Sequence, residues 1–541
     1  MTRITPVRGT LRTKSLRVGS LRRNLEFFVQ VAEETTGSPV RKNGFNTEFM
    51  QECLTMPKLP MSACRGMVSL AVAVCVWGCG LMVEASDTHT NVVVILADDC
   101  TWSDLGVYGG HAQTPNLDKL AAEGMTFRRC FQAAPMCSPT RHCLYTGLYP
   151  VKSGAYPNHT FVKPDVKSIA HYLTNGGYRV ALSGKRHIHP LENFPFEFSE
   201  DPEGTRRERN PDFEAVEEFL SECSESGAPF GLFICSTEPH TPYTLGDPSA
   251  YPIGQIVLPP HYVDTPETRR QFQKYLAEIT YFDSQVGRTL DLLEKSGAAE
   301  STLVMVLSEQ GNSFPFAKWT CYDAGVQSGL IVRWPQHVSA GSVTDAMVEY
   351  VDVVPTLLEA TGLEATGTEK ELDGRSFLPV LRGETERHKD FTFSLQTTRG
   401  IYHGSEYYGI RSVRGKGMRY ILNLTPEAMF QNSVLRTKWW KSWKAEARSG
   451  NEDAETLMMR YQVRPREELY DCENDPWNLT NLAGEKEHEA IQEELSEALH
   501  RWMVSQGDLG QETELDAKNR QWDFEANRPA SSESSEGQSG H

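Results

Sequence analysis

Two six-residue segments of the chain, Asn91–Leu96 (NVVVIL) and Thr302–Leu307 (TLVMVL), are apolar almost throughout and carry no charge. A strand that is apolar on both faces has to be covered on both faces, which is typical of the centre of a sheet between two helical layers. Helical patterns alternate with these and other apolar runs, which favours an α/β fold. Further strands are predicted at 178–183, 230–235 and 330–334, and helices at 166–174 and 265–295.

The pattern changes after about residue 385. Residues 408–413 and 418–422 flank the turn sequence Arg414-Gly415-Lys416-Gly417, which predicts a hairpin, and a helix is predicted near 487–504. We therefore expect four regions. They are an N-terminal extension with a signal peptide (1–85), a large α/β domain (88–385), a smaller C-terminal α/β domain containing an antiparallel sheet (386–506), and a disordered tail (507–541).

The segment Gly66–Val83 is apolar, follows Lys58 and Arg65, and ends next to the small residue Ala85. This pattern indicates a signal peptide cleaved near Ala85 and hence an exported protein, whether periplasmic, secreted or lumenal. A single membrane anchor is the alternative interpretation of the same segment. We expect no other membrane association.

Charge and cysteine content exclude some classes of protein. The 541-residue chain has a formal net charge of -18, which argues against general binding to nucleic acid. An anionic substrate would need a local cationic pocket. The 12 cysteines lack zinc-finger spacing and are too sparse for a disulfide scaffold, and no disulfide pairing can be assigned.

Polar side chains follow the C-terminal ends of four predicted strands. In open α/β sheets that edge binds ligands, so these side chains are expected to converge on one site. The oxygen donors suit a hard divalent cation, calcium or magnesium, and the cationic groups can hold a tetrahedral anion and transfer protons. The predicted metal ligands are Asp98, Asp99, Glu309 and Gln310, and the cationic set is Arg141, Lys185, His187, His240 and Lys318.

The segment Cys137–Gly147 (CSPTRHCLYTG) resembles the signature of type I sulfatases, Cys-x-Pro-x-Arg followed by Thr-Gly. In that family the cysteine is oxidised to formylglycine after translation. The other blocks of the family follow in order, so the resemblance covers roughly residues 91 to 480. These blocks are Asp98-Asp99 with Leu105-Gly106 and Tyr108-Gly109, Gly184-Lys185-Arg186-His187, Pro239-His240-Thr241-Pro242, Ser308-Glu309-Gln310-Gly311, and Lys318.

The resemblance implies an alkaline phosphatase-like mixed sheet flanked by helices, a divalent metal with calcium as the first expectation, and a formylglycine-generating maturation enzyme as partner. In the implied mechanism one hydroxyl of hydrated formylglycine at 137 attacks sulfur, and the second later expels sulfate. His187 would handle the hydroxyl proton and His240 would protonate the leaving group. Lys185 and Lys318 would hold sulfate oxygens.

The residue types in this segment suit that chemistry independently of the family. Pro139 at the first turn of a short helix leaves backbone N–H groups facing position 137, which favours an anion there. Arg141, one turn further on, can hold an oxygen-rich group bidentately.

Two departures from the family pattern stand out. Glu309-Gln310 replaces Asp-Asn, which lengthens each side chain by one methylene and affects metal distance or affinity. Arg186 and Ile188-His189 replace Trp and Leu-Gly around the histidine, which affects the shape of the pocket.

The sequences Gly184–Pro190 and Phe194–Phe198 look most like the sulfamidase (heparan N-sulfatase) branch and its bacterial relatives. A sulfated glycan is therefore the expected substrate, and Asn158-His159 either reads the sugar or is an exposed loop. Two alternatives stay open: a phosphoester or phosphonate hydrolase of the same superfamily, and a non-catalytic protein that binds sulfated glycans.

Overall fold

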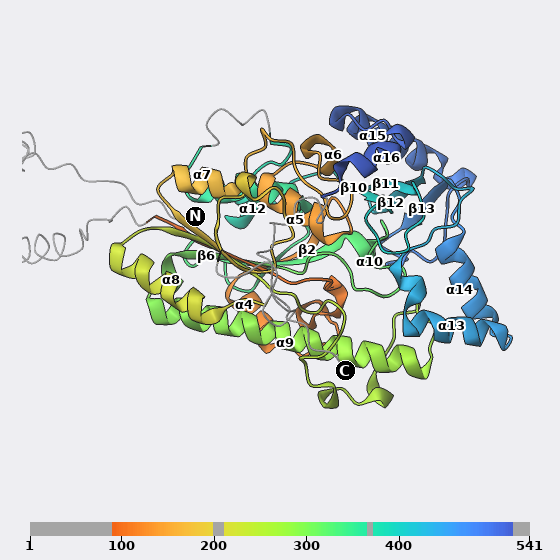
Figure 1. The fold of residues 1–541 in the computed structure, drawn as a ribbon, viewed down its shortest axis with the longest axis horizontal. Coiled ribbons are helices and arrows are strands. Elements are labelled where there is room, and N and C mark those ends of the chain that lie inside the picture. The colour runs from red at the N-terminus through yellow and green to blue at the C-terminus, as the bar shows by residue number, and fades with distance from the viewer. Residues whose placement is uncertain (1–88, 199–209, 365–371, 523–541) are drawn as a thin grey trace, which may run out of the picture. The chain divides into compact units, whose positions relative to one another are not determined.

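The structure is a computed structural model that describes residues 89–198, 210–364 and 372–522 (Figure 1). The predicted signal peptide and the end of the predicted tail, 523–541, lie outside the described residues. Everything described belongs to one compact unit that begins at His89.

The main sheet has nine strands in the order β4-β3-β5-β1-β6-β7-β2-β8, with β9 also paired to β2. The strands β4, β3, β5, β1 and β6 are mutually parallel, and β7 runs antiparallel to both neighbours. This mixed sheet confirms the predicted fold class. The bounds are β1 Asn91–Leu96, β2 Met125–Phe131, β3 Arg179–Gly184, β4 Glu197–Phe198, β5 Phe230–Cys235, β6 Thr302–Leu307, β7 Gln327–Arg333, β8 Ser342–Thr344 and β9 Val348–Glu349.

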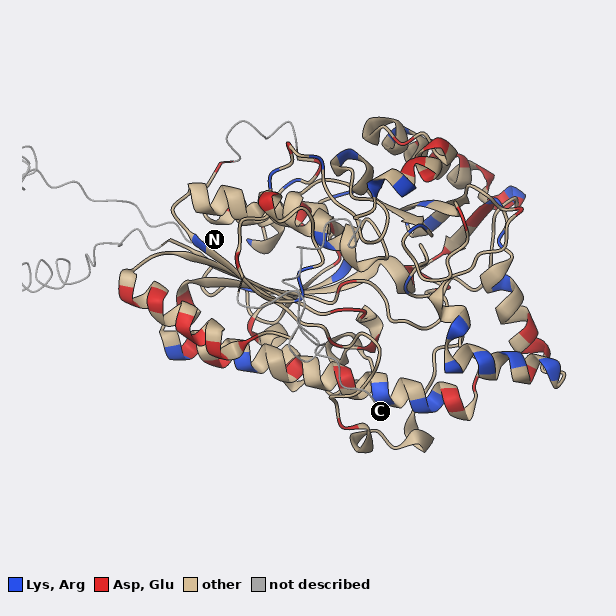
Figure 2. Ribbon diagram, viewed as in Figure 1, with Lys and Arg blue, Asp and Glu red and all other residues tan. Residues whose placement is uncertain are grey.

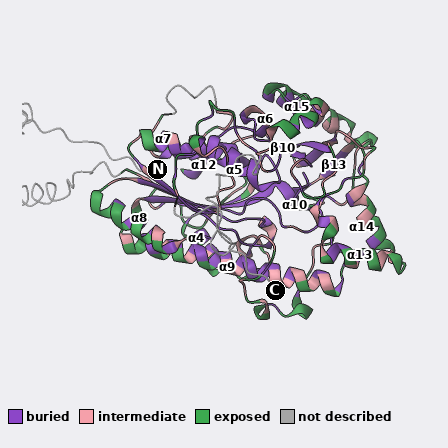
Figure 3. Cartoon of the chain, viewed as in Figure 1, coloured by how far each residue is buried: buried purple, intermediate pink, exposed green. Residues whose placement is uncertain are grey.

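Side chains of β1 alternate between the two faces of the sheet, and both faces are buried. Val93 and Ile95 pack into one core with α4, α8 and α9, whereas Val92 and Val94 pack into the other with α5, α7, α11 and α12. Figure 1 shows these two helical layers, and Figure 3 shows the sheet between them as buried. The helices are α4 Pro115–Glu123, α5 Cys137–Thr146, α7 Ile169–Asn175, α8 Phe213–Ser226, α9 Pro266–Ser296, α11 Val353–Ala360 and α12 Leu378–Leu381.

A second sheet follows, in which all neighbours are antiparallel, and it contains the predicted hairpin as β11 and β12. The hydrophobic clusters of the molecule include residues from both sheets, so the domain boundary near residue 385 stays a prediction. The elements are β10 Phe391–Thr397, β11 Gly409–Gly415, β12 Met418–Asn423, β13 Glu467–Asp471, α13 Lys438–Arg448, α14 Glu452–Gln462 and α15 Glu489–Gln506.

The prediction of a disordered tail from residue 507 is wrong for the part that the structure describes. Residues 508–522 contain the helix α16, Gln511–Asp516, and fold back onto the large sheet's loops. Their polar side chains are used in buried ion pairs: the fully buried Arg411 pairs with both Asp508 and Glu514. The polar composition of this segment therefore did not mean disorder, because the buried Arg411 of β11 neutralises its acidic residues.

Two further observations concern the described residues. The eight cysteines among them are all free and buried. None of the helices in residues 89–198, 210–364 and 372–522 combines the length and apolar character needed to cross a lipid bilayer.

Candidate active site

The C-terminal ends of β1, β3, β5 and β6 meet at one edge of the sheet, as the sequence predicted. The backbone itself joins them: Ala97 N–H donates to Leu307 O at 3.0 Å, and Asp98 N–H donates to Glu238 O at 2.9 Å. The four segments that leave these strands therefore start side by side. They bring together Asp98 and Asp99 after β1, Lys185 and His187 after β3, His240 after β5, and Glu309 and Gln310 after β6.

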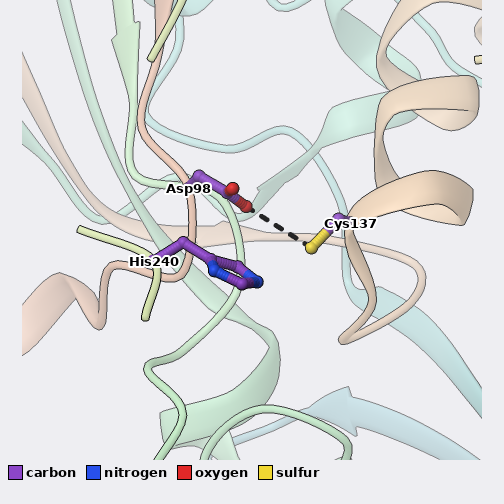
Figure 4. Close-up of side chains that lie close together, drawn as sticks. All are labelled: Asp98, Cys137 and His240. Atoms are coloured by element: carbon purple, nitrogen blue, oxygen red, sulfur yellow. Dashed lines mark hydrogen bonds between the residues drawn. The ribbon is translucent and has the colours of Figure 1, made fainter. Parts of the chain in front are cut away.

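Helix α5 delivers Cys137 to the same place, because Cys137 is its first residue. The Sγ atom is almost fully buried and lies 3.4 Å from Asp98 Oδ1 (Figure 4). Gln310 Nε2 lies 3.0 Å from the sulfur and Lys318 Nζ lies 3.3 Å from it. Asp99 Oδ1 is 3.7 Å from the sulfur, which thus faces two carboxylates, one amide and one ammonium at the positive end of a helix.

Asp99 is held by groups from distant parts of the chain. Lys318 Nζ lies 2.6 Å from Oδ1, and Gln310 Nε2 donates to the same oxygen at 2.6 Å. The Ser313 hydroxyl donates to Oδ2 at 2.9 Å, and His240 Nε2 is 3.5 Å from Oδ2. Ser313 was not predicted from the sequence. Its position three residues after Gln310, in the segment that also contains Lys318, could have indicated it.

Further ion pairs lie in the site. Lys185 contacts Asp98 directly, and Arg141 Nε lies 2.8 Å from Glu309 Oε1. Arg141 is completely buried and also donates from Nη1 to the carbonyl of Lys185 at 3.0 Å. Its side chain therefore contacts Glu309, the backbone and, with Nη2 4.0 Å from Oδ1, also Asp98, so Arg141 links two carboxylates of the site.

The site has the donors that a hard cation requires. Carboxylate oxygens of Asp98, Asp99 and Glu309 and the sulfur of Cys137 all lie within 4.8 Å of one another. Among the described residues Gln310 Oε1 is buried without a hydrogen-bond partner, and a half-turn of the amide would exchange it with the Nε2 that now faces Asp99. Several oxygen ligands close together, one of which has no hydrogen-bond partner, suit a hard cation such as calcium or magnesium.

Burial and neighbouring charges set the protonation states. Burial disfavours a charged Asp98, but Lys185 and His240 hold its pKa well below the usual range. Burial raises the pKa of Glu309 well above its usual range. It also raises the pKa of the Cys137 thiol to about 12. The unmodified sulfur is therefore a neutral thiol at pH 7 and a weak nucleophile.

His187 makes a contact that the sequence only hinted at. Its Nε2 lies 3.0 Å from Nδ1 of His159, and burial lowers the pKa of both imidazoles. The loop of His159 is held by the C-terminal segment: Trp522 N–H donates to the carbonyl of His159 at 2.6 Å, and the Trp522 ring stacks on His189. Nothing in the local sequence connects residue 522 to this loop.

The backbone at the site is strained. Asp99, His187 and Glu309 have φ values of 63°, 51° and 62°, and His159 has 55°. A side chain other than glycine in this region costs on the order of 1 kcal/mol or more, so the surrounding contacts must maintain these conformations. Such strain is common where a fold orients reactive groups.

Comparison with known proteins identifies the family. A family model described as "Sulfatase" matches residues 90–363, and a second, described as "N-sulphoglucosamine sulphohydrolase, C-terminal", matches residues 311–433. An ulvan-active sulfatase from Formosa agariphila is 30% identical over 436 residues, covering 79% of this chain and 82% of that protein. The chain therefore belongs to the sulfatase family and is a sulfatase hydrolase.

Two other similarities agree with this. Human N-sulphoglucosamine sulphohydrolase is 26% identical over 479 residues, covering 76% of this chain and 89% of that protein. A solved structure of a protein with its substrate D-glucosamine-2-N,6-O-disulfate has a TM-score of 0.60 at 18% identity, covering 78% of this chain and 99% of that one, and shows the same fold. Membership of the family implies a metal and a formylglycine in general, and it does not favour the phosphoesterase or the non-catalytic alternative.

Proposed function

We propose that this sulfatase removes sulfate from a sulfated glycan, with N-sulfoglucosamine as the first compound to test and O-sulfated sugars next. Relatives named for ulvan and for N-sulphoglucosamine support a carbohydrate substrate. The match to the C-terminal model of the N-sulphoglucosamine enzyme supports the N-sulfo group as the first choice. Export through the predicted signal peptide would bring the enzyme to such glycans.

The observation that carries the proposal is the surroundings of Cys137. We propose that a maturation enzyme converts this residue to formylglycine, whose hydrate supplies an oxygen nucleophile for attack on sulfur. The side chain at 137 starts a helix and lies beside Asp98, Gln310 and Lys318. An oxygen at this position would be next to both the proposed metal ligands and a cation.

Each neighbouring residue has a proposed task. Asp98, Asp99, Glu309 and Gln310 hold a divalent cation, calcium first and magnesium second, which would neutralise negative charge on the sulfate and the nucleophile. Lys185 and Lys318 hold sulfate oxygens, and Arg141 keeps Glu309 in place.

His187 accepts the proton of the hydroxyl at 137, and His240 donates one to the leaving group. Burial lowers the pKa of both imidazoles, so both are neutral before substrate binds. An arriving sulfate would raise both pKa values, which couples proton donation by His240 to the presence of substrate.

The test combines mass spectrometry with a sulfate-release assay. The tryptic peptide 130–141 from active protein should carry an aldehyde at 137 that a hydrazine reagent traps. Cys137→Ala should bind substrate without turnover, whereas Cys143→Ala, a buried cysteine of the same helix, should keep its activity. Full activity with an unmodified thiol at 137, or in Cys137→Ala, would overturn the mechanism.

The substrate is tested with defined saccharides that carry N-, 2-O-, 3-O-, 4-O- or 6-O-sulfate. Release from N-sulfoglucosamine supports the first choice, and release from O-sulfated sugars alone would correct it. If phosphate esters were hydrolysed and no sulfated saccharide was, the proposed substrate class would be wrong.

A further inference from the structure

Helix α13 has two opposite faces. Trp439, Trp440 and Trp443 are buried on one face, and an exposed row of cations lies on the other. Residues three and four positions apart share a helix face, so the cations form one stripe about 15 Å long. We call this stripe the α13 row; it consists of Lys438, Lys441, Lys444 and Arg448.

The tryptophan face fixes the helix to α9 and to the loop that contains Phe314. Trp443 Nε1 donates to Thr268 Oγ1 of α9 at 2.9 Å, and the Trp439 ring stacks on Phe314 with centroids 4.8 Å apart. Phe314 belongs to the loop that carries Gln310 and Lys318 in the active site. The α13 row is therefore held rigidly on a helix that packs directly against an active-site loop.

The cations of the α13 row have no partner among the residues that the structure describes. In the part of the chain that the structure describes, none of the four takes part in an ion pair or a side-chain hydrogen bond, whereas other exposed cations do. Lys295 pairs with Glu217, Lys416 with Glu494 and Arg270 with Glu267. Figure 2 shows the concentration of basic residues along α13.

The overall charge of the chain makes this row unusual. The formal net charge is -18, so a row of four unpaired cations works against the field of the rest of the molecule. The acidic residues that follow, Glu452, Asp453 and Glu455, lie in the first turn of α14, where they complement that helix's dipole. A linear polyanion could contact all four cations at once, but a single sulfate group could contact only one or two.

We propose that the α13 row is a second binding site for a long sulfated glycan, which it holds by its charges while one sulfate is hydrolysed at the active site. This inference rests on the proposed substrate class and adds that the substrate is a polymer. An anionic membrane fits the row less well, because the apolar face of α13 is buried in the protein and cannot insert into lipid.

Binding is tested in the Cys137→Ala protein, so that the result does not depend on hydrolysis. The probes are heparan sulfate and ulvan fragments graded from monosaccharide to long chains. Affinity should rise with chain length. In the variant with Lys438, Lys441, Lys444 and Arg448 all changed to Gln, that rise should be lost, with long-chain affinity reduced about tenfold or more at low salt and less at high salt.

A matched control removes the same number of charges elsewhere. It changes four exposed cations that lie outside α13 to Gln and should keep the dependence on chain length. The double variant Lys441→Gln/Lys444→Gln should give an intermediate loss, and circular dichroism verifies that every variant is folded. The control residues are Lys119, Arg128, Lys295 and Arg501.

Three results would overturn the inference. They are an equal loss of affinity in the control, an unchanged affinity in the α13 variant, and an equal dependence on the α13 row for anionic lipid vesicles or for single-stranded DNA. The inference and the proposed function fail separately. Hydrolysis of sulfated monosaccharides with no role for α13 would remove only the inference, and length-dependent binding through α13 without any hydrolysis by wild-type protein would remove only the proposed function.

Discussion

The molecule contains two buried clusters of carboxylates and cations that differ in one informative way. The first, which we call the junction cluster, lies between the two sheets and contains Glu349, Asp352 and Lys389. Every carboxylate oxygen of this cluster accepts a hydrogen bond. Glu349 Oε2 accepts from Tyr149 and Lys389, and Oε1 accepts from the backbone N–H of Phe393. Each oxygen of Asp352 accepts from one backbone N–H, and Lys389 lies 2.7 Å from one of them.

The active-site cluster of Asp98, Asp99 and Glu309 is less completely satisfied. Gln310 Oε1 lacks a partner within the described residues, and Asp99 and Glu309 have positive φ, whereas Glu349 and Asp352 have ordinary backbone angles. Charge and burial alone therefore do not separate a functional cluster from a structural one. Between these two clusters, the unpartnered Gln310 oxygen and the strained backbone distinguish the active-site cluster.

Glu309→Gln should give the largest effect in this comparison. The substitution removes a charged metal ligand without changing its shape, so kcat/KM should fall by about a hundredfold or more. The free energy of unfolding of metal-free protein should fall as well, because the completely buried Arg141 loses its carboxylate partner, and loss of one partner of a buried pair costs about 3–5 kcal/mol. Steady-state kinetics and urea unfolding measure the two quantities. A large loss of stability with retained activity would place Glu309 with the structural cluster.

Removal of the metal should separate the clusters in another way. Exhaustive chelation should abolish turnover, and calcium or magnesium should restore it. Because the metal binds only folded protein, saturation at a hundred times Kd should add about 2.7 kcal/mol to the stability of wild type. Glu309→Gln should gain much less. Full activity without metal would contradict the assignment, and recovery with zinc alone would point to phosphatase chemistry.

Asp352→Asn should damage stability but spare chemistry. The carboxylate of Asp352 is fully buried and the side chain of its partner Lys389 is only 12% exposed, and loss of one partner of a buried pair costs about 3–5 kcal/mol. The midpoint of urea unfolding should fall accordingly, while kcat of the folded protein stays near the wild-type value. A change in kcat without a change in the midpoint would show that the junction cluster acts on the active site.

Asp104 differs from the carboxylates of both clusters, because among the described residues it is buried beside the neutral side chains of Tyr275 and Asn312 and not beside a cation. Burial raises its pKa to about 7. The folded state therefore keeps a proton that the unfolded state releases near pH 4. The contribution of Asp104 to the free energy of unfolding is complete below pH 4 and is lost as the pH rises to about 7. The slope is at most about 1.4 kcal/mol per pH unit. Asp104→Asn should flatten urea-unfolding stability between pH 5 and 7, and an unchanged slope would contradict the shift.

Much of the fold and of the candidate site could be predicted from local sequence. Uninterrupted apolar runs such as Asn91–Leu96 have to be buried on both faces, which led to the central strands and to the α/β class. Residues directly after parallel strands share one edge by geometry, so Asp98, Lys185 and Glu309 were expected together. Their convergence follows from topology and needs no knowledge of side-chain packing.

The tertiary structure decided everything that depends on contacts between distant segments. The pairing of Arg141 with Glu309, the contact of His159 with His187, and the return of Trp522 to that loop join residues far apart in the chain. The unpaired state of the α13 row was also invisible beforehand, because the sequence shows which residues are charged but not which charges meet. Local sequence determines the hydrophobic periodicity and which polar residues follow each strand. Which buried charges pair with each other is determined only when the chain has folded.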